Sequence, residues 1–328
     1  MTYRVVIPTA GIGSRLKNLT KNINKSLVSV SNRPILSHLI DHFPKTCEFV
    51  IPLGHKGDLV KNFLELAYPE RVFYFVNVNP YKGRGSGLGH SLLSCKKYLQ
   101  QPFVFISCDT LVKEKIPKPD HNWIGFSSVK NLKSYRTLKI EKNYVKEINE
   151  KGKNISKASR AYIGLAGINN YKNFWKAMKT GNKIAVDQGE AFGLKKILEK
   201  VSIKSFLFTW FDTGNLKTLD LTRKLYQNKK EPNILEKQNE AIWFVNDKVI
   251  KFSTDNNFIK NRFIRAKKLK GFVPNVLKCK NNMYSYEKVQ GQVFSDVVNP
   301  KLFENFLDYC SVFWKKSKMN IKERNSFK

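Results

Sequence analysis

The sequence lacks a long apolar run and has few cysteines. No apolar segment approaches the roughly 18 residues of a membrane-spanning helix, so no transmembrane helix is expected. The first residues form a strand-like apolar run instead of the charged, apolar and small-residue regions of a signal peptide, which predicts a cytoplasmic protein. The cysteines number five and none forms a C-x-x-C pair, so we interpret them as reduced thiols packed as small hydrophobic residues and expect no zinc site.

Acidic residues are scarce beside basic ones. The chain has 26 Asp and Glu against 59 Lys and Arg, a formal net charge of +33 over 328 residues. Three interpretations fit such an excess: an unspecialised solvated surface, steering of anionic metabolites, and binding of nucleic acid. The basic residues are spread along the chain with no dense arm or tail. Binding of nucleic acid is therefore the least favoured of the three interpretations.

Residues 1–227 alternate short apolar segments with helical patterns. Short buried strands separated by helices predict an α/β domain with a mostly parallel, Rossmann-like sheet flanked by helices. The strands that decide this prediction are expected at residues 3–8, 48–53, 71–78 and 103–108.

The pattern changes after residue 227. Residues 228–239 are polar and are interpreted as a linker. Residues 241–253 predict a β-hairpin with an Asn246-Asp247 turn. A basic helix, a further strand and a second helix follow, so residues 240–328 are expected to form a small α+β domain.

The first candidate site follows the first predicted strand. Gly11 and Gly13 lie in a turn whose backbone N–H groups could approach a phosphate closely. Arg15 and Lys25 supply fixed positive charge nearby. The pattern is neither the dinucleotide fingerprint nor the P-loop, since Leu16 stands where a third glycine would be.

The same segment resembles the opening motif of the sugar-phosphate nucleotidylyltransferases, G-x-G-[ST]-R-L followed by P-K. This family includes sugar-1-phosphate and phosphocholine nucleotidylyltransferases. Asn24 stands in place of the usual proline, and we expect this to loosen the loop while leaving Lys25 in place. The resemblance implies catalytic roles for Arg15 and Lys25, and nucleotide contacts from Ala10, Gly11, Gly13 and Ser14.

Two aspartates follow apolar strands. Asp109 ends the segment F-V-F-I-S-C-D, and Asp212 lies in W-F-D-T-G-N. Each could simply cap a turn or a helix, although ligands of open α/β sheets gather at the carboxyl ends of strands. The resemblance implies that both aspartates bind Mg²⁺, an ion that prefers few carboxylates together with water and phosphate oxygens.

Three further segments follow the family's order. Gly87 and Leu88 resemble the turn that opens a helix beside the nucleobase, and Glu150-Lys151 resembles the segment near the second substrate. Gly164 lies in a segment like the strand that lines the acceptor pocket. A helix-capping turn and solvated turn residues are the plain structural alternatives for the first two.

The resemblance carried by these motifs implies a magnesium-dependent enzyme. It would transfer a nucleoside monophosphate from an NTP, with CTP or UTP favoured, to a small phosphorylated acceptor and release pyrophosphate. A sugar 1-phosphate and phosphocholine both stay open as acceptors, and the product would serve surface-polysaccharide or glycoconjugate synthesis. A nucleotide-binding regulatory protein without turnover and a basic nucleic-acid-binding protein are the alternatives.

Residues 240–328 resemble the small lobe of the aminoglycoside and choline kinase superfamily. Lys251 resembles the strand lysine that holds ATP phosphates, and residues 286–289 resemble the hinge. No histidine follows His121, so the H-x-D catalytic loop of such kinases is absent. We therefore expect the chain to be part of a longer bifunctional protein and to have no kinase activity; a plain α+β appendage is the alternative.

Overall fold

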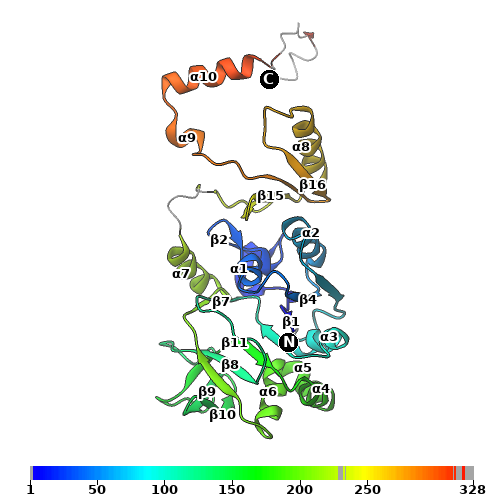
Figure 1. The fold of residues 1–328 in the computed structure, drawn as a ribbon, viewed down its shortest axis with the longest axis vertical. Coiled ribbons are helices and arrows are strands. Elements are labelled where there is room, and N and C mark those ends of the chain that lie inside the picture. The colour runs from blue at the N-terminus through cyan, green and yellow to red at the C-terminus, as the bar shows by residue number, and fades with distance from the viewer. Residues whose placement is uncertain (1–2, 228–231, 233, 313, 315–319, 322–328) are drawn as a thin grey trace. The chain divides into compact units, whose positions relative to one another are not determined.

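The computed structural model describes residues 3–227, 232, 234–312, 314 and 320–321. Residues Met1–Lys288 form one compact unit and Val289–Lys328 form a second. The first unit contains a nine-stranded sheet with helices on both faces and a smaller four-stranded sheet (Figure 1). Within the described residues, none of the helices has the length and apolar character needed to cross a membrane.

The first four strands in the order of the large sheet are parallel, as predicted. The sheet has the order β5-β4-β1-β6-β11-β8-β12-β10-β9. Its first four strands run parallel to one another: β5 (Phe73–Asn77), β4 (Glu48–Leu53), β1 (Arg4–Val6) and β6 (Phe103–Ile106). Each is linked to the next along the chain through a helical crossover, which parallel neighbours require.

The other side of the sheet is mixed, so the prediction of a mostly parallel Rossmann-like sheet is wrong there. Strand β11 (Arg160–Ile168) runs antiparallel to β6, β8 and β9. Strands β9 (Thr137–Glu141) and β10 (Tyr144–Asn149) form an antiparallel hairpin, while β12 (Lys204–Leu207) pairs parallel to β8 (Trp123–Ser127). An apolar segment indicates that a strand is buried but not the direction of its neighbour, and this is why the sequence pattern misled.

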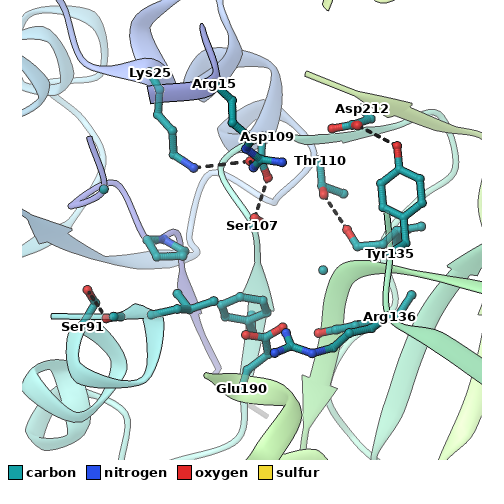
Figure 2. A pocket seen from close by; sticks show the side chains of 18 of the residues that line it. Arg15, Lys25, Ser91, Ser107, Asp109, Thr110, Tyr135, Arg136, Glu190 and Asp212 are labelled. Atoms are coloured by element: carbon teal, nitrogen blue, oxygen red, sulfur yellow. Dashed lines mark hydrogen bonds and ion pairs between the residues drawn. The ribbon is translucent and has the colours of Figure 1, made fainter. Parts of the chain in front are cut away.

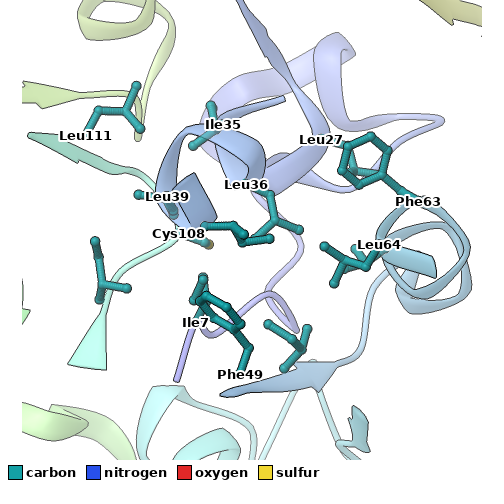
Figure 3. Packing of buried hydrophobic residues seen from close by; sticks show 14 of the residues in the cluster. Ile7, Leu27, Ile35, Leu36, Leu39, Phe49, Phe63, Leu64, Cys108 and Leu111 are labelled. Atoms are coloured by element: carbon teal, nitrogen blue, oxygen red, sulfur yellow. The ribbon is translucent and has the colours of Figure 1, made fainter. Parts of the chain in front are cut away.

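The central strands bury both of their faces. Val5 and Phe49 belong to the hydrophobic cluster that includes the core faces of α1 (Ile35–Asp41) and α2 (Gly57–Ala67) (Figure 3). Val6 belongs to the opposite cluster, with residues of α3 (Leu88–Cys95) and α4 (Tyr171–Thr180). Successive side chains of a strand point to opposite faces. The near-continuous apolar runs in the sequence follow from this two-sided burial.

The remaining elements of this region are short. Helix α7 (Leu216–Tyr226) is capped by Asn215, whose side chain accepts a hydrogen bond from the Thr218 N–H at 3.1 Å. Sequence analysis did not predict β7 (Thr110–Val112), β10, α5 (Asn182–Gln188), β2 (Ser29–Val30), β3 (Arg33–Pro34) or the 3-10 helices η1 (Ser14–Thr20), η2 (Lys25–Leu27) and η3 (Lys96–Tyr98). Helix α6 (Glu190–Leu198) and strand β13 (Trp210–Asp212) complete this region.

The four-stranded sheet is antiparallel, in the order β14-β15-β17-β16. Its strands are β14 (Glu240–Val245), β15 (Lys248–Ser253), β16 (Val276–Lys280) and β17 (Met283–Glu287), with α8 (Asn256–Lys268) between β15 and β16. Strands β14 and β15 confirm the predicted hairpin, and Asn246 in its turn has the positive φ of 55° that such turns favour.

This small sheet packs against the first part of the chain. Trp243 is fully buried, with its ring centroid 5.4 Å from that of Phe63 in α2. Its Nε1 donates a hydrogen bond to Ser29 Oγ at 3.1 Å, and Lys280 forms an ion pair with Glu65. The division into domains at residues 228–239 stays a prediction, but the segment that follows belongs to the same compact unit through Lys288.

In the described part of the second unit lie the helices α9 (Phe294–Val297) and α10 (Pro300–Ser311). Asn299 caps α10 by accepting a hydrogen bond from the Leu302 N–H at 2.9 Å. Pro300 occupies the first turn, where its missing N–H costs nothing. The predicted helix over residues 300–315 is thus confirmed as far as Ser311, and residues 313 and 315 lie outside the described residues.

Candidate active site

A cleft of about 390 Å³ opens where β1 and β6 end (Figure 2). Its volume lies within the range of about 300–1,000 Å³ that is usual for small-molecule sites. Most residues predicted for the site line this cleft: Ala10, Gly11, Arg15, Lys25, Gly87, Leu88, Asp109, Lys151, Gly164 and Asp212. The other three, Gly13, Ser14 and Glu150, are not among its lining residues.

The two aspartates are brought together by a short antiparallel ribbon. Strand β13 pairs with β7 so that Asp212 lies opposite Thr110, the residue after Asp109. The Thr213 N–H and hydroxyl both donate to the Asp109 carbonyl oxygen, at 3.0 and 3.1 Å. Two residues far apart in the sequence are therefore fixed beside one another by backbone pairing.

Both carboxylates converge on Gly214. A Cβ atom added to this glycine would lie 3.0 Å from Asp212 Oδ1 and 3.2 Å from Asp109 Oδ2. The side chain of Asp109 accepts a hydrogen bond from Ser107 Oγ at 2.6 Å, and Asp212 accepts one from Tyr135 Oη at 2.9 Å. The absence of a side chain at Gly214 leaves open the space that both carboxylates face.

The cationic side chains of Lys25 and Arg15 extend toward the carboxylate of Asp109. Lys25 Nζ lies 3.3 Å from Asp109 Oδ2, and Arg15 Nη2 lies 3.7 Å from the same oxygen. Burial alone would raise the pKa of Asp109, but Lys25, Ser107 and Arg15 together outweigh it and lower this pKa. Burial likewise opposes the charged form of Lys25, yet the neighbouring Asp109 carboxylate leaves the lysine pKa raised. Both groups are ionised at neutral pH.

Asn24 holds the loop that carries Lys25, which corrects the expectation of a loosened loop. Its side chain is fully buried and donates to the carbonyl oxygens of Thr9 at 2.8 Å and His55 at 2.6 Å. Its Oδ1 accepts hydrogen bonds from the Ser26 N–H at 2.9 Å and hydroxyl at 2.8 Å. A proline restricts one backbone dihedral, whereas Asn24 fixes the turn through these contacts.

Different packing contacts explain why glycine is needed in the two turns. Gly13 adopts a φ of 73°, and a Cβ there would approach Lys25 Cβ to 2.8 Å, so this glycine lets the loop lie against the lysine. Ser14 is exposed at the start of η1. At Gly87 an added Cβ would lie 2.6 Å from the Val186 carbonyl oxygen. Packing of α3 against α5 therefore requires a glycine here as well.

The predicted pair of Glu150 and Lys151 separates in the structure. Lys151 lines the cleft, but Glu150 is engaged by two cations. Arg136 Nε lies 3.0 Å from Glu150 Oε2, and Lys195 pairs with the other carboxylate oxygen. Burial raises the pKa of Glu150, but Lys195 and Arg136 outweigh burial and lower it. In this arrangement Glu150 positions Arg136, which itself lines the cleft.

Sequence analysis did not single out Tyr135, Arg136, Tyr162 or Glu190 as site residues, although all four line the cleft. Tyr135 and Arg136 come from a loop without a recognisable motif. Glu190 is only 3% exposed, and burial, which Arg136 opposes, raises its pKa. The one available signal was a carboxylate directly after Gly189 at the start of a predicted apolar helix.

The described residues contain no cluster of three or more His, Cys, Asp or Glu side chains suited to a metal ion. The pair Asp109 and Asp212 is a smaller set. It suits an ion that completes its shell with water and phosphate oxygens, as Mg²⁺ does. The thiols of all five cysteines are free, and Cys279 is the only one of them that is not buried.

No protein-family model matches the chain. Among curated relatives, it is 24% identical over 220 residues to the bifunctional protein GlmU of Methanococcus vannielii, which covers 64% of this chain and 51% of that protein. The chain thus spans about half the length of this relative.

Solved structures of nucleotidyltransferases share the fold. The CTP:phosphocholine cytidylyltransferase of Streptococcus pneumoniae superimposes with a TM-score of 0.59 and 17% identity, covering 69% of this chain and 100% of that one. A UDP-glucose pyrophosphorylase complexed with UDP-glucose gives a TM-score of 0.58 and 17% identity, covering 69% and 98%. The mixed α/β fold of this chain is therefore that of nucleotidyltransferase structures.

Proposed function

We propose that the chain is a nucleotidylyltransferase that joins a nucleoside monophosphate from an NTP to a small phosphorylated acceptor. One observation carries the proposal. The carboxylates of Asp109 and Asp212 and the cations Arg15 and Lys25 converge at one point of the cleft. Retention of all four charges favours an enzyme over a nucleotide-binding regulator, because simple binding would not need a paired set of carboxylates.

The residues suit an in-line attack on a phosphate. An oxygen of the acceptor's phosphate would bond to the α-phosphorus while the bond to the β-phosphate breaks and pyrophosphate leaves. Positioning and charge neutralisation supply most of the catalysis in such reactions. Arg15 is the more exposed cation and suits the leaving pyrophosphate, while the less exposed Lys25 suits the reacting phosphates.

Asp109 and Asp212 would hold Mg²⁺ in the space left by Gly214. The bound ion would supply charge neutralisation of the reacting phosphates. Ser107 and Tyr135 orient the two carboxylates through their hydrogen bonds. The side chains of this site therefore have complementary roles, two for the ion, two for the phosphates and two for orientation.

The nucleotide is proposed to bind beside Ala10, Gly11, Gly87 and Leu88, which all line the cleft. A pyrimidine nucleotide, CTP or UTP, is the proposed donor, and the similar solved structures include a CTP-dependent enzyme and one bound to UDP-glucose. We also propose a cytoplasmic site of action, and synthesis of a polysaccharide or glycoconjugate precursor as its purpose.

A pyrophosphate-release assay tests the reaction directly. The purified chain is incubated with Mg²⁺, each of the four NTPs and a panel of hexose 1-phosphates and phosphocholine. We expect pyrophosphate release with one pyrimidine nucleotide, and we expect this release to depend on the acceptor.

Lys25→Ala should lower kcat by about ten- to a hundredfold and should raise KM less, since the lysine charge acts mainly on the transition state.

Lys176→Ala is the matched control for this assay, because Lys176 is an exposed lysine of α4. It should behave as the wild type. Acceptor-independent release, or release that survives Lys25→Ala unchanged, would place the activity outside this cleft. Absence of turnover with every pair, despite tight NTP binding, would favour the regulatory alternative.

The small sheet is proposed to be a kinase-like small lobe without kinase activity. Its strand order, with α8 inserted between β15 and β16, supports the first part. Active kinases pair the strand lysine with a glutamate of the helix. Helix α8 has no acidic residue, and Lys251 Nζ instead lies 2.8 Å from Glu240 Oε2 in β14.

The purified chain should therefore form no phosphorylated product from ATP and either choline or a free sugar. Product would be followed by mass spectrometry, with an active choline kinase as the positive control. Phosphorylation above background by the chain itself would contradict this part of the proposal.

A further inference from the structure

The segment that carries Lys25 is contacted on both sides of the lysine by the small sheet and the residues leading into it. Before the lysine, Asn22 Nδ2 donates a hydrogen bond to Asn239 Oδ1 at 2.9 Å. After it, Ser29 Oγ accepts a hydrogen bond from Trp243 Nε1 at 3.1 Å. Lys25 therefore lies between two points of attachment, three residues after the first and four before the second.

Both attachments are anchored in the small sheet. The Asn239 carbonyl oxygen accepts the N–H of Thr254, directly after β15, at 3.0 Å, and Trp243 lies within β14. The backbone contributes as well, because the Phe244 N–H donates at 2.9 Å to the carbonyl oxygen of Asn32, in the turn between β2 and β3. The β2-β3 hairpin is thus joined to β14 by main-chain and side-chain hydrogen bonds.

The contact is buried at its centre. Trp243 is fully buried and belongs to the same hydrophobic cluster as Leu27, Val28 and Val30. Leu27 ends η2, the short helix that begins at Lys25. The apolar face of the small sheet is therefore part of the core that holds η2. Close-packed cores transmit displacements, so a shift of this face would move the backbone of the lysine.

A different set of contacts docks the small sheet on α2. The ring of Phe63 packs against Trp243, and Lys280 of β16 forms an ion pair with Glu65. The side chain of Asn22 takes no part in this docking. Its hydrogen bond instead ties the loop before Lys25 to the start of the small sheet.

We propose that the small sheet positions Lys25 for nucleotidyl transfer, with Asn22 and Ser29 as the positioning residues. The inference rests on the proposed function and adds a part of the chain that controls the same site. Lys25 Nζ lies 3.3 Å from Asp109 Oδ2, and a misplacement of about 1 Å can lower a reaction rate about a hundredfold. Asn24 ties the turn to the segment after β1, and the small sheet fixes the residues before and after this turn.

Steady-state pyrophosphate release by variants of the full chain tests the assignment. The double variant Asn22→Ala/Ser29→Ala should lower kcat by about five- to fiftyfold, because it loosens the reactive geometry. KM for the NTP and for the acceptor should each change by less than about twofold, because no group that contacts a substrate is removed. Ser29→Thr keeps the hydroxyl that accepts the Trp243 N–H and should behave as the wild type.

Two comparisons separate positioning from a general loss of stability. In a Lys25→Ala background the double variant should cause no further loss of kcat, because its effect acts through the lysine. Glu65→Gln weakens the docking on α2 by removing the ion pair with Lys280, and this matched control should keep the kcat of the wild type. Circular dichroism would confirm that every variant is folded at the assay temperature.

Hydrogen exchange followed by mass spectrometry gives a second measurement that needs no turnover. Peptides within residues 13–34 should exchange at least about threefold faster in the double variant than in the wild type, because local opening becomes easier when the attachments are lost. Peptides from β4 and β6 should exchange at the same rate in both.

The assignment is overturned if the double variant keeps the kcat of the wild type, or if exchange over residues 13–34 is unchanged. An equally large loss of kcat in the Lys25→Ala background, or in Glu65→Gln, would also overturn it, because the effect would then not act through the lysine. The proposed function fails separately, if the wild type releases no pyrophosphate with any NTP while exchange over residues 13–34 still rises in the double variant.

Discussion

Asp109→Asn and Asp212→Asn should each lower kcat/KM for nucleotidyl transfer by at least about a hundredfold. Charge stabilisation at a reacting phosphate contributes several kcal/mol, and an amide of the same size removes the charge while it keeps most contacts. Asp212 offers the cleaner test. The Gly214 N–H donates to Oδ1 and the Tyr135 hydroxyl donates to Oδ2, so the asparagine oxygen can keep the backbone hydrogen bond while its amide group donates to the Tyr135 oxygen instead.

The measurement is steady-state pyrophosphate release over a range of Mg²⁺ concentrations. Asp220→Asn, an exposed carboxylate on α7, is the matched control and should be neutral. Because the Asp109 pKa is lowered in the folded chain, this group stabilises the fold at neutral pH. That contribution is lost as the pH falls through the folded pKa, so circular dichroism should accompany the Asp109→Asn assays. Near-normal, Mg²⁺-dependent activity in either variant would falsify its role as a ligand.

Trp243→Ala should lower the free energy of unfolding of the first unit by about 3–5 kcal/mol, the usual cost of truncating a buried aromatic side chain to alanine. The substitution removes the contact with Phe63 and leaves Ser29 Oγ without the Nε1 donor. It thereby tests whether residues 240–288 stabilise the nucleotidyltransferase fold. Urea unfolding of the full chain, followed by circular dichroism, measures the effect.

Leu225→Ala is the control, because this side chain on α7 is 71% exposed and such substitutions usually stay within about 0.5 kcal/mol. A loss confined to a separate, early transition would show instead that the small sheet unfolds independently. In that case the boundary at residues 228–239 would mark a true domain division.

The site shows how far local sequence can go. The motifs and the alternation of apolar residues predict that Asp109 follows a buried strand and that Lys25 follows the glycine turn. The structure adds how these residues are held. Asn24 replaces a stiff proline with four hydrogen bonds, to groups that include His55, which belongs to the following βα connection. No local sequence pattern predicts such hydrogen bonds between a loop side chain and distant backbone groups.

The predicted substrate pair was the least well placed by sequence. Glu150 and Lys151 are neighbours in the chain, but only Lys151 lines the cleft, since Glu150 is held by Arg136 and Lys195. Sequence analysis did not predict Glu190 as a site residue, because a carboxylate at the start of a helix is common and usually exposed. Its burial depends on the packing of α6 against α4 and β10, which only the folded chain reveals.

The sequence by itself determined most of the longer strands and helices and the charged residues of the phosphate site, because each depends on periodicity or on a motif within a few residues. The tertiary structure alone decided the directions of β9 to β12, the convergence of Asp109 with Asp212 and the packing of Trp243 on Phe63. Each of these joins segments distant in the chain. Their pairing is selected by the free energy of the whole fold, to which backbone hydrogen bonds and buried apolar surface contribute together.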